Sequence, residues 1–145
     1  MTEPQSGDGL PIVVVGAHLS GLPLNSELTG SGGALVRSAR TAPDYRLFAL
    51  PNTSPPKPGM VRQPGFAGPG IEVEIWTLPP EAFTRFVAKI PAPLGIGKIT
   101  LDDGSSVSGF LAEAHAVVGA EEITAFGGWR AYLASLRRSA MAQSG

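Results

Sequence analysis

The chain has 145 residues, of which 43% are hydrophobic and 16% are charged, so it can form one domain with a buried core and is not composed like a disordered protein. Its formal net charge of -1 offers no basic surface to nucleic acid or to an anionic membrane. The absence of cysteine excludes disulfides, thiolate metal ligands and cysteine nucleophiles.

The two ends of the chain are predicted to lie outside the domain, which is expected to span residues 11–138. Residues 1–10 are polar and contain glycine, which indicates a flexible tail, and residues 139–145 form a second polar tail. Glu3 and Asp8 stand where a secretory signal needs basic residues and an apolar run. No apolar stretch is long enough to span a bilayer. These features predict a cytoplasmic protein with no membrane partner.

The first predicted element is a buried strand at residues 12–15, an unbroken β-branched run that ends at Gly16. A strand of this kind is a rigid support for the loop that follows it, and functional residues are often held on such loops. Asn25 or Ser26 is predicted to cap a short helix, and the glycines within residues 30–33 would end it.

The middle of the chain shows the alternation of half-buried strands. Residues 34–41 and 45–50 alternate and are predicted to pair as a hairpin. Residues 52–59 contain three prolines and cannot form a central strand, whereas residues 60–61 fit a short edge strand. Residues 71–76 alternate most cleanly.

The last third of the chain combines two helices with a hairpin. Residues 78–90 begin with two prolines and then follow a helical stripe, and residues 128–136 form a second amphipathic helix. Residues 97–101 and 107–113 are predicted strands on either side of an Asp-Asp-Gly turn. Six or seven short strands with two or three helices predict an α+β fold with a mostly antiparallel or mixed sheet.

His18 is the first candidate for chemistry, because an imidazole can exchange a proton near neutral pH. The alternative is a histidine that braces its loop by bonding a backbone carbonyl. Ser20 could be a nucleophile or only a turn residue, and Asn25 could be a pocket donor or a helix cap. Two distant histidines without cysteine make no metal site.

Glu72 and Glu74 lie on one face of their predicted strand, and Trp76 continues that face. If this face lines a pocket, the pKa of one carboxyl group rises and that group serves as a general acid or base. If it faces water, both are ordinary solvated charges. Glu81, at the start of the following helix, is a third candidate.

Further ligand-binding candidates come from one strand and one turn. Tyr45 could form a hydrogen bond in a pocket, and Arg40 or Arg46 could bind a carboxylate through two hydrogen bonds. The alternative for each is a surface residue, which is the more common case. The glycine-rich stretch with Leu94 and Gly95 would let the backbone approach a ligand closely, or it is simply a tight turn.

Five segments, taken together, resemble one known family. They are GAHLSGLPLN at 16–25, RTAPDYRL at 40–47, PPKPG at 55–59, IPAPLGIG at 90–97 and AFGGWRAYL at 125–133. In this order they resemble the C-terminal domain of allophanate hydrolase, here expected as a freestanding single-domain protein. The resemblance implies a γ-glutamyl cyclotransferase-like fold, with a curved, barrel-like sheet, flanking helices and a pocket at its mouth.

The resemblance also implies a function. In that family an amidase domain cleaves allophanate, and the C-terminal domain is thought to decarboxylate the N-carboxycarbamate product. This chain is expected to process that compound, or a related small carboxylated amide, in urea and nitrogen metabolism. His18 would move a proton, and Tyr45 or Glu72 would orient the leaving nitrogen. No cofactor is implied; a separate amidase is the expected protein partner, and a homodimer is also considered.

Gly16, Ala17, His18 and Leu19 fall where the cyclotransferase-like fold has Tyr-Gly-Ser-Leu, a motif whose backbone binds substrate. The aromatic position is Val15 here, which argues against γ-glutamyl substrates. A cyclotransferase-like enzyme therefore remains one alternative, and a non-catalytic module that binds a small ligand or assembles with an amidase is another. The predicted substrate-binding residues are Gly16, Ala17, Leu19, Ser20, Asn25, Arg46, Leu94 and Gly95.

Overall fold

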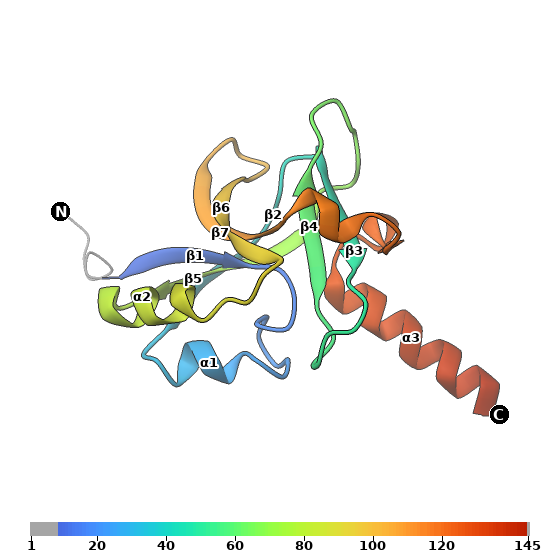
Figure 1. Cartoon of the computed structure of the whole chain (residues 1–145), viewed down its shortest axis with the longest axis horizontal. Helices are drawn as coiled ribbons and strands as arrows, with labels where there is room; N and C mark the ends of the chain where they lie inside the picture. The colour runs from blue at the N-terminus through green and yellow to red at the C-terminus, as the bar shows by residue number, and fades with distance from the viewer. Residues whose placement is uncertain (1–8, 145) are drawn as a thin grey trace.

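The computed structural model describes residues 9–144, which fold into two β-sheets and three α-helices, so the predicted α+β class is confirmed (Figure 1). The sheets curve around a common core and are barrel-like, without closing into a barrel. The five-stranded sheet has the order β2 (Ala34–Arg40), β5 (Glu72–Leu78), β1 (Leu10–Val14), β7 (Ser106–Ala112) and β6 (Leu94–Thr100). The three-stranded sheet has the order β4 (Pro58–Arg62), β3 (Tyr45–Ala49) and β8 (Glu121–Glu122).

The β-branched run near the N-terminus forms β1, the central strand of the larger sheet. Its last three residues are buried, because β5 pairs with it antiparallel on one side and β7 parallel on the other. The parallel contact is short and joins Val13 to Gly109. The predicted hairpin of β6 and β7 is confirmed over seven paired positions.

One predicted pairing is wrong. Strands β2 and β3 form as expected but do not make a hairpin, because β2 pairs with β5 and β3 pairs with β4 and β8. The connection between them carries the chain from one sheet to the other. Thr41 accepts a hydrogen bond from the Ile71 backbone, and the Ala42 backbone donates to Thr100. Alternation predicted the strands, but it carries no information about which partner each strand takes.

The helices differ from the sequence prediction mainly at their ends. Helix α1 (Ser26–Thr29) is a single turn, and Asn25 precedes it without making a side-chain cap. Helix α2 (Pro80–Ala88) begins after Pro79, as two prolines in the first turn predict. Two 3-10 turns follow the second hairpin strand, η1 (Ala114–Val117) and η2 (Thr124–Phe126).

Helix α3 (Trp129–Ser144) is longer than predicted. It continues through most of the segment that was expected to be a polar tail, so this segment is helical as far as Ser144. Of the predicted N-terminal tail, Leu10 belongs to β1, and residues 1–8 lie outside the described residues. The assignment of residues 11–138 as the whole domain stays a prediction.

One hydrophobic core joins the two sheets. It contains Ile12 and Leu78 from the larger sheet and Tyr45 and Leu47 from the smaller one. In Figure 1, α1 and α2 lie on the same side of β1 and β5, and α3 runs away from the sheets toward the C-terminus.

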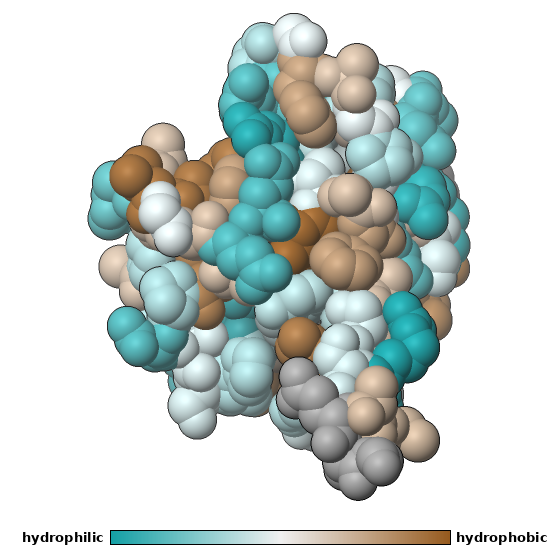
Figure 2. All heavy atoms as spheres, turned by 90° about the vertical axis from the view of Figure 1, so that its right-hand side faces the viewer, coloured by the Kyte–Doolittle hydropathy of each residue, from teal (hydrophilic) through white to brown (hydrophobic). Residues whose placement is uncertain are grey.

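The surface around α3 carries hydrophobic side chains in separate groups that hydrophilic residues divide (Figure 2). Phe126, Leu136 and Met141 are among the exposed large hydrophobic residues. The homodimer stays a prediction. Within residues 9–144, no helix has both the length and the apolar character needed to cross a lipid bilayer.

We predict that Gly109→Ala destabilises the fold by about 1–3 kcal/mol. A Cβ at this position would lie 2.6 Å from the Val13 Cβ and 2.8 Å from the Val13 carbonyl oxygen, so β7 could no longer approach β1. Urea denaturation measures the change in the free energy of unfolding. Gly95→Ala is the matched control, because a Cβ there meets no atom within 4 Å, and its stability should match or exceed that of the wild type. Equal losses in both variants would contradict this account of Gly109.

Candidate functional site: the His18 cavity

The loop after β1 is a tightly bonded turn that fixes the position of His18. The Leu19 backbone donates to the Gly16 carbonyl at 3.0 Å, and the Leu24 backbone donates to Ala17 at 2.9 Å. The Asn25 side-chain amide donates to the His18 carbonyl at 2.8 Å, which explains why Asn25 does not cap α1. Leu19 is fully buried and anchors the loop in the core.

Gly16 is required where the chain leaves β1. A Cβ at this position would lie 2.3 Å from Cδ of Pro58, so only glycine allows the loop to pass beside β4. The β-branched strand, the glycine and the bonded turn together place the His18 ring beside Phe86 of α2.

His18 lies between a carboxylate and two aromatic rings. Its Nε2 is 2.8 Å from Oε1 of Glu27, and its ring is 5.1 Å from that of Phe86 and 5.2 Å from that of Phe110. Because a carboxylate only accepts hydrogen bonds, Nε2 donates to it and Nδ1 is left without the proton. The side chain is 12% exposed.

Burial dominates the titration of His18 and lowers its pKa below the ordinary value of 6.5. The hydrogen bond and the charge of Glu27 oppose this shift, and the positive charge of Lys57 adds to it. His18 is therefore neutral at neutral pH. Since its pKa is lower in the folded state, the stability that the neutral ring gives is complete above about pH 6.5 and falls as the pH drops toward the folded pKa.

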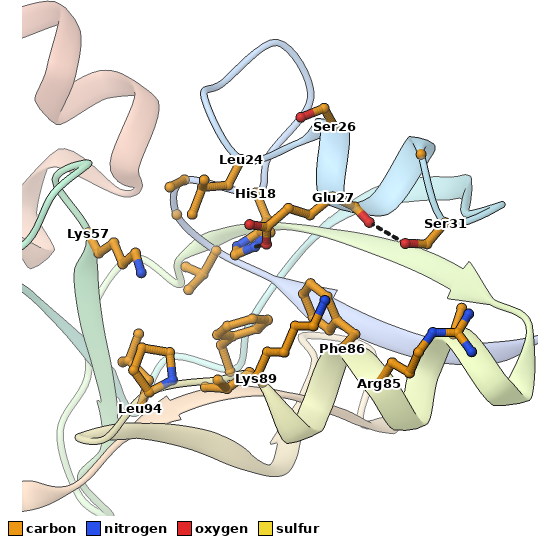
Figure 3. A pocket seen from close by; sticks show the side chains of 18 of the residues that line it. His18, Leu24, Ser26, Glu27, Ser31, Lys57, Arg85, Phe86, Lys89 and Leu94 are labelled. Carbon is orange, nitrogen blue, oxygen red and sulfur yellow. Dashed lines mark hydrogen bonds and ion pairs between the residues drawn. The ribbon is translucent and has the colours of Figure 1, made fainter.

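A cavity of about 520 Å³ opens beside His18 (Figure 3). The loop after β1, helix α1, the start of β4, helix α2 and the hairpin strands all contribute to its wall. Phe86 and Phe110 give it an apolar side. Of the described residues that line it, Glu27 alone is acidic, whereas Lys57, Arg85 and Lys89 are cationic. Such a wall favours a small anionic ligand over a cationic one.

A second polar cluster lies behind the loop, on Glu74 of β5. Its Oε1 accepts hydrogen bonds from the Ser20 backbone at 2.8 Å, the Ser20 hydroxyl at 2.9 Å and the Trp76 indole at 3.0 Å. Arg130 of α3 donates to its Oε2 at 3.1 Å and to the Ser20 carbonyl at 2.6 Å. Glu74 thus ties the His18 loop to the sheet and to the last helix.

A raised pKa was expected for a carboxyl group of β5 that lines a pocket, and Glu74 does not line the cavity. Burial acts in that direction, but the hydrogen bonds from Trp76, Ser20 and Arg130 outweigh it and lower the pKa of Glu74. Glu74 is therefore an ionised structural carboxylate. Glu72 bonds Arg130 at 3.3 Å and Glu81 is almost fully exposed, and neither lines the cavity.

The structure brings part of the predicted binding set together with His18. Gly16, Ala17 and Leu94 line the cavity with it. Ser20 and the buried Leu19 hold the loop from behind, and so does Asn25.

The remaining predicted site residues lie elsewhere. Tyr45 is fully buried in the core, where its hydroxyl accepts a hydrogen bond from the Thr100 backbone at 2.8 Å. Arg46 is bonded to Glu122 and to Gln63 on the smaller sheet. Gly95 does not line the cavity. Catalytic or binding roles for these residues stay predictions, and their placement gives those roles no support.

Several cavity residues were not identified from the sequence: Glu27, Lys57, Lys89, Phe86 and Phe110. Only the phenylalanine of α2 carried a signal, as part of a helical apolar stripe, and that signal indicated core packing. The two lysines and the glutamate stand in separate segments with no spacing that marks a site. Only the tertiary fold brings these three residues to the same cavity.

The fold is one that solved structures of other proteins share. The structure matches that of a gamma-glutamyl cyclotransferase with a TM-score of 0.53 at 13% identity, over 79% of this chain and 69% of that one, which shows a shared fold alone. The match to Kluyveromyces lactis allophanate hydrolase is much stronger. It has a TM-score of 0.86 and 36% identity, and it covers 92% of this chain but 22% of that one.

The family model of the allophanate hydrolase C-terminal domain matches residues 10–134. The chain therefore belongs to this family, as the sequence resemblance predicts. It is 38% identical over 132 residues to urea amidolyase of Saccharomyces cerevisiae, which covers 89% of this chain and 7% of that protein. The chain thus spans a small fraction of the curated relatives it matches.

A uropathogenic E. coli-specific protein, c4763, is similar over nearly its whole length. The two structures match with a TM-score of 0.79 and 40% identity, over 87% of this chain and 96% of that one. The fold therefore also occurs in a chain that consists of little else.

We predict that Glu74→Gln lowers the free energy of unfolding by about 2–4 kcal/mol. An amide cannot accept from four donors as the carboxylate does, and it leaves the Arg130 charge without its buried partner. Glu72→Gln is the control, because Glu72 is partly exposed and makes one long contact, and it should cost less than about 1 kcal/mol. Urea denaturation measures both, and equal costs would refute the structural role of Glu74.

We predict that Glu27→Gln lowers the pKa of His18 further. The substitution removes the hydrogen bond to a charged acceptor and the negative charge, which are the two effects that raise this pKa. NMR titration of the His18 ring protons measures the shift. Glu81→Gln, at an exposed carboxylate that does not line the cavity, should leave the titration unchanged. A His18 pKa that rises or stays constant in Glu27→Gln would contradict this electrostatic account.

Proposed function

We propose that this chain decarboxylates N-carboxycarbamate, or a closely related small carboxylated amide, in the breakdown of urea in the cytoplasm. The observation that carries the proposal is His18, whose imidazole lines a cavity with cationic walls and is hydrogen-bonded to Glu27 at 2.8 Å. Membership of the allophanate hydrolase C-terminal domain family supports the substrate class.

The reaction needs charge stabilisation and one proton. N-carboxycarbamate carries a carboxylate at each end of a central nitrogen. When one carbon–nitrogen bond breaks, carbon dioxide leaves and the electron pair stays on nitrogen, which takes up a proton to give carbamate. Carbamate then breaks down to ammonia and carbon dioxide. A proton donor beside the nitrogen lowers the barrier, because the developing negative charge is neutralised as it forms.

His18 has the environment of such a proton carrier. In the empty cavity burial holds it neutral, but a bound dianion would favour the imidazolium form and let His18 take a proton from solvent. Glu27 fixes the ring through Nε2, which leaves the other nitrogen to exchange the proton. Asn25 donates to the His18 carbonyl and so supports the loop, and its role as a pocket donor stays a prediction.

A separate amidase is the proposed source of the substrate. The relatives carry this domain as a small part of a longer protein: urea amidolyase in one case and allophanate hydrolase in the other. The C-terminal domain and its supplier thus occur on one polypeptide there, and we propose that they cooperate here as well.

We predict that this protein accelerates ammonia and carbon dioxide release from allophanate when it is added to an allophanate hydrolase lacking its own C-terminal domain. His18→Ala should lose about 100-fold or more of that acceleration, since general acid–base catalysis contributes on this scale. His115→Ala is the matched control, because its side chain is 75% exposed and does not line the His18 cavity.

Full acceleration by His18→Ala would refute the role of the imidazole. No acceleration by the wild-type protein would favour a non-catalytic module that binds a small carboxylated ligand or docks an amidase. Release of 5-oxoproline from a γ-glutamyl substrate would instead identify a cyclotransferase.

A further inference from the structure

Two lysines from different elements reach the His18 cavity. Lys57 follows the proline-rich segment and immediately precedes β4, and Lys89 follows the last residue of α2. Figure 3 shows both side chains directed toward the open space beside His18. Lys57 is also close enough to His18 for its charge to affect the ring.

Neither lysine has an acidic partner in the described part of the chain. No ion pair within 4.0 Å joins a carboxylate to either ammonium group. Arg85, the third cation, differs from them, because it lies 4.0 Å from Glu81 and points away from His18 in Figure 3. Lysine side chains that meet a cavity without a carboxylate are positioned to bind an anion.

The positive charge of the cavity wall suits a ligand that carries more than one negative charge. Lys57 and Lys89 carry two positive charges that no carboxylate within 4.0 Å offsets, because Glu27 is directed at His18 and Glu81 lies beside Arg85. A ligand with a single carboxylate would leave one lysine uncompensated.

We infer that Lys57 and Lys89 bind the two ends of a small dianion, so that the cavity selects a dicarboxylate-type ligand over a monocarboxylate. The inference rests on the proposed function and deepens it, because N-carboxycarbamate carries a carboxylate at each end, whereas its product carbamate carries one. Loss of one carboxylate then weakens binding, and the product leaves.

Binding of the dianion also changes His18. The positive charge of Lys57 lowers the pKa of His18 in the empty cavity, and a carboxylate bound to that lysine would cancel the effect. The ligand thereby raises the pKa of His18 at the moment when a proton donor is required.

The test uses malonate, a stable dicarboxylate in which a methylene replaces the nitrogen of N-carboxycarbamate, and acetate as the monocarboxylate. NMR titration should show that wild-type protein binds malonate at least about tenfold more tightly than acetate. Lys57→Gln and Lys89→Gln should each reduce malonate affinity about tenfold and reduce the preference over acetate. Lys98→Gln is the control, because Lys98 bonds Ser108 outside the cavity. This variant should bind malonate as tightly as the wild type does.

The inference fails if the wild type shows no preference for malonate, or if either cavity variant keeps full malonate affinity. A titration of His18 in saturating malonate provides a second readout, and an unchanged or lowered pKa would also overturn the inference. The coupled turnover assay is independent of this test. Lysine-dependent malonate binding without turnover would support the dianion site and refute the decarboxylation. Turnover together with malonate binding that does not depend on the lysines would support the decarboxylation and refute the dianion site.

Discussion

The ionised carboxylate of Glu74 is the constraint on which the rest of the site depends. It lies inside the fold and accepts from the loop that carries His18, from the indole of Trp76 and from Arg130. A buried charge of this kind is tolerated only when its hydrogen bonds are satisfied. The His18 loop, Trp76 and Arg130 must therefore all keep the positions from which they donate to Glu74. The loop therefore holds His18 in place before any ligand arrives, which reduces the ordering cost of binding.

The cavity combines two environments that act on His18 in opposite directions. Phe86 and Phe110 pack against the ring and remove water from it, and Glu27 opposes that effect from the other side. The balance leaves the ring neutral, and the charge of a bound ligand can still change the pKa of His18. An apolar wall gives electrostatic contacts more weight, because charges interact more strongly where water is excluded.

Local sequence patterns were enough to predict β1, β5, the β6–β7 hairpin and the α+β class, since each depends on residues close together in the chain. The break at Gly16 also identified the His18 loop. Pairing of β2 with β5 was not predicted, because alternation does not name a partner. The true role of Glu74 and the lysines of the cavity were missed for the same reason: Arg130 lies 56 residues from Glu74, and no local spacing links them.

The contact between Arg130 and the carbonyl of Ser20 joins residues 110 positions apart, so the loop after β1 is closed by a helix that is synthesised much later. During synthesis on a ribosome the β-branched run of β1 emerges long before β5, β7 and α3 exist to cover it. Contacts of such long range slow folding, and an unpaired apolar strand is prone to aggregation. In a nascent chain, β1 therefore stays unpaired until the segments that form β5 and β7 have been synthesised.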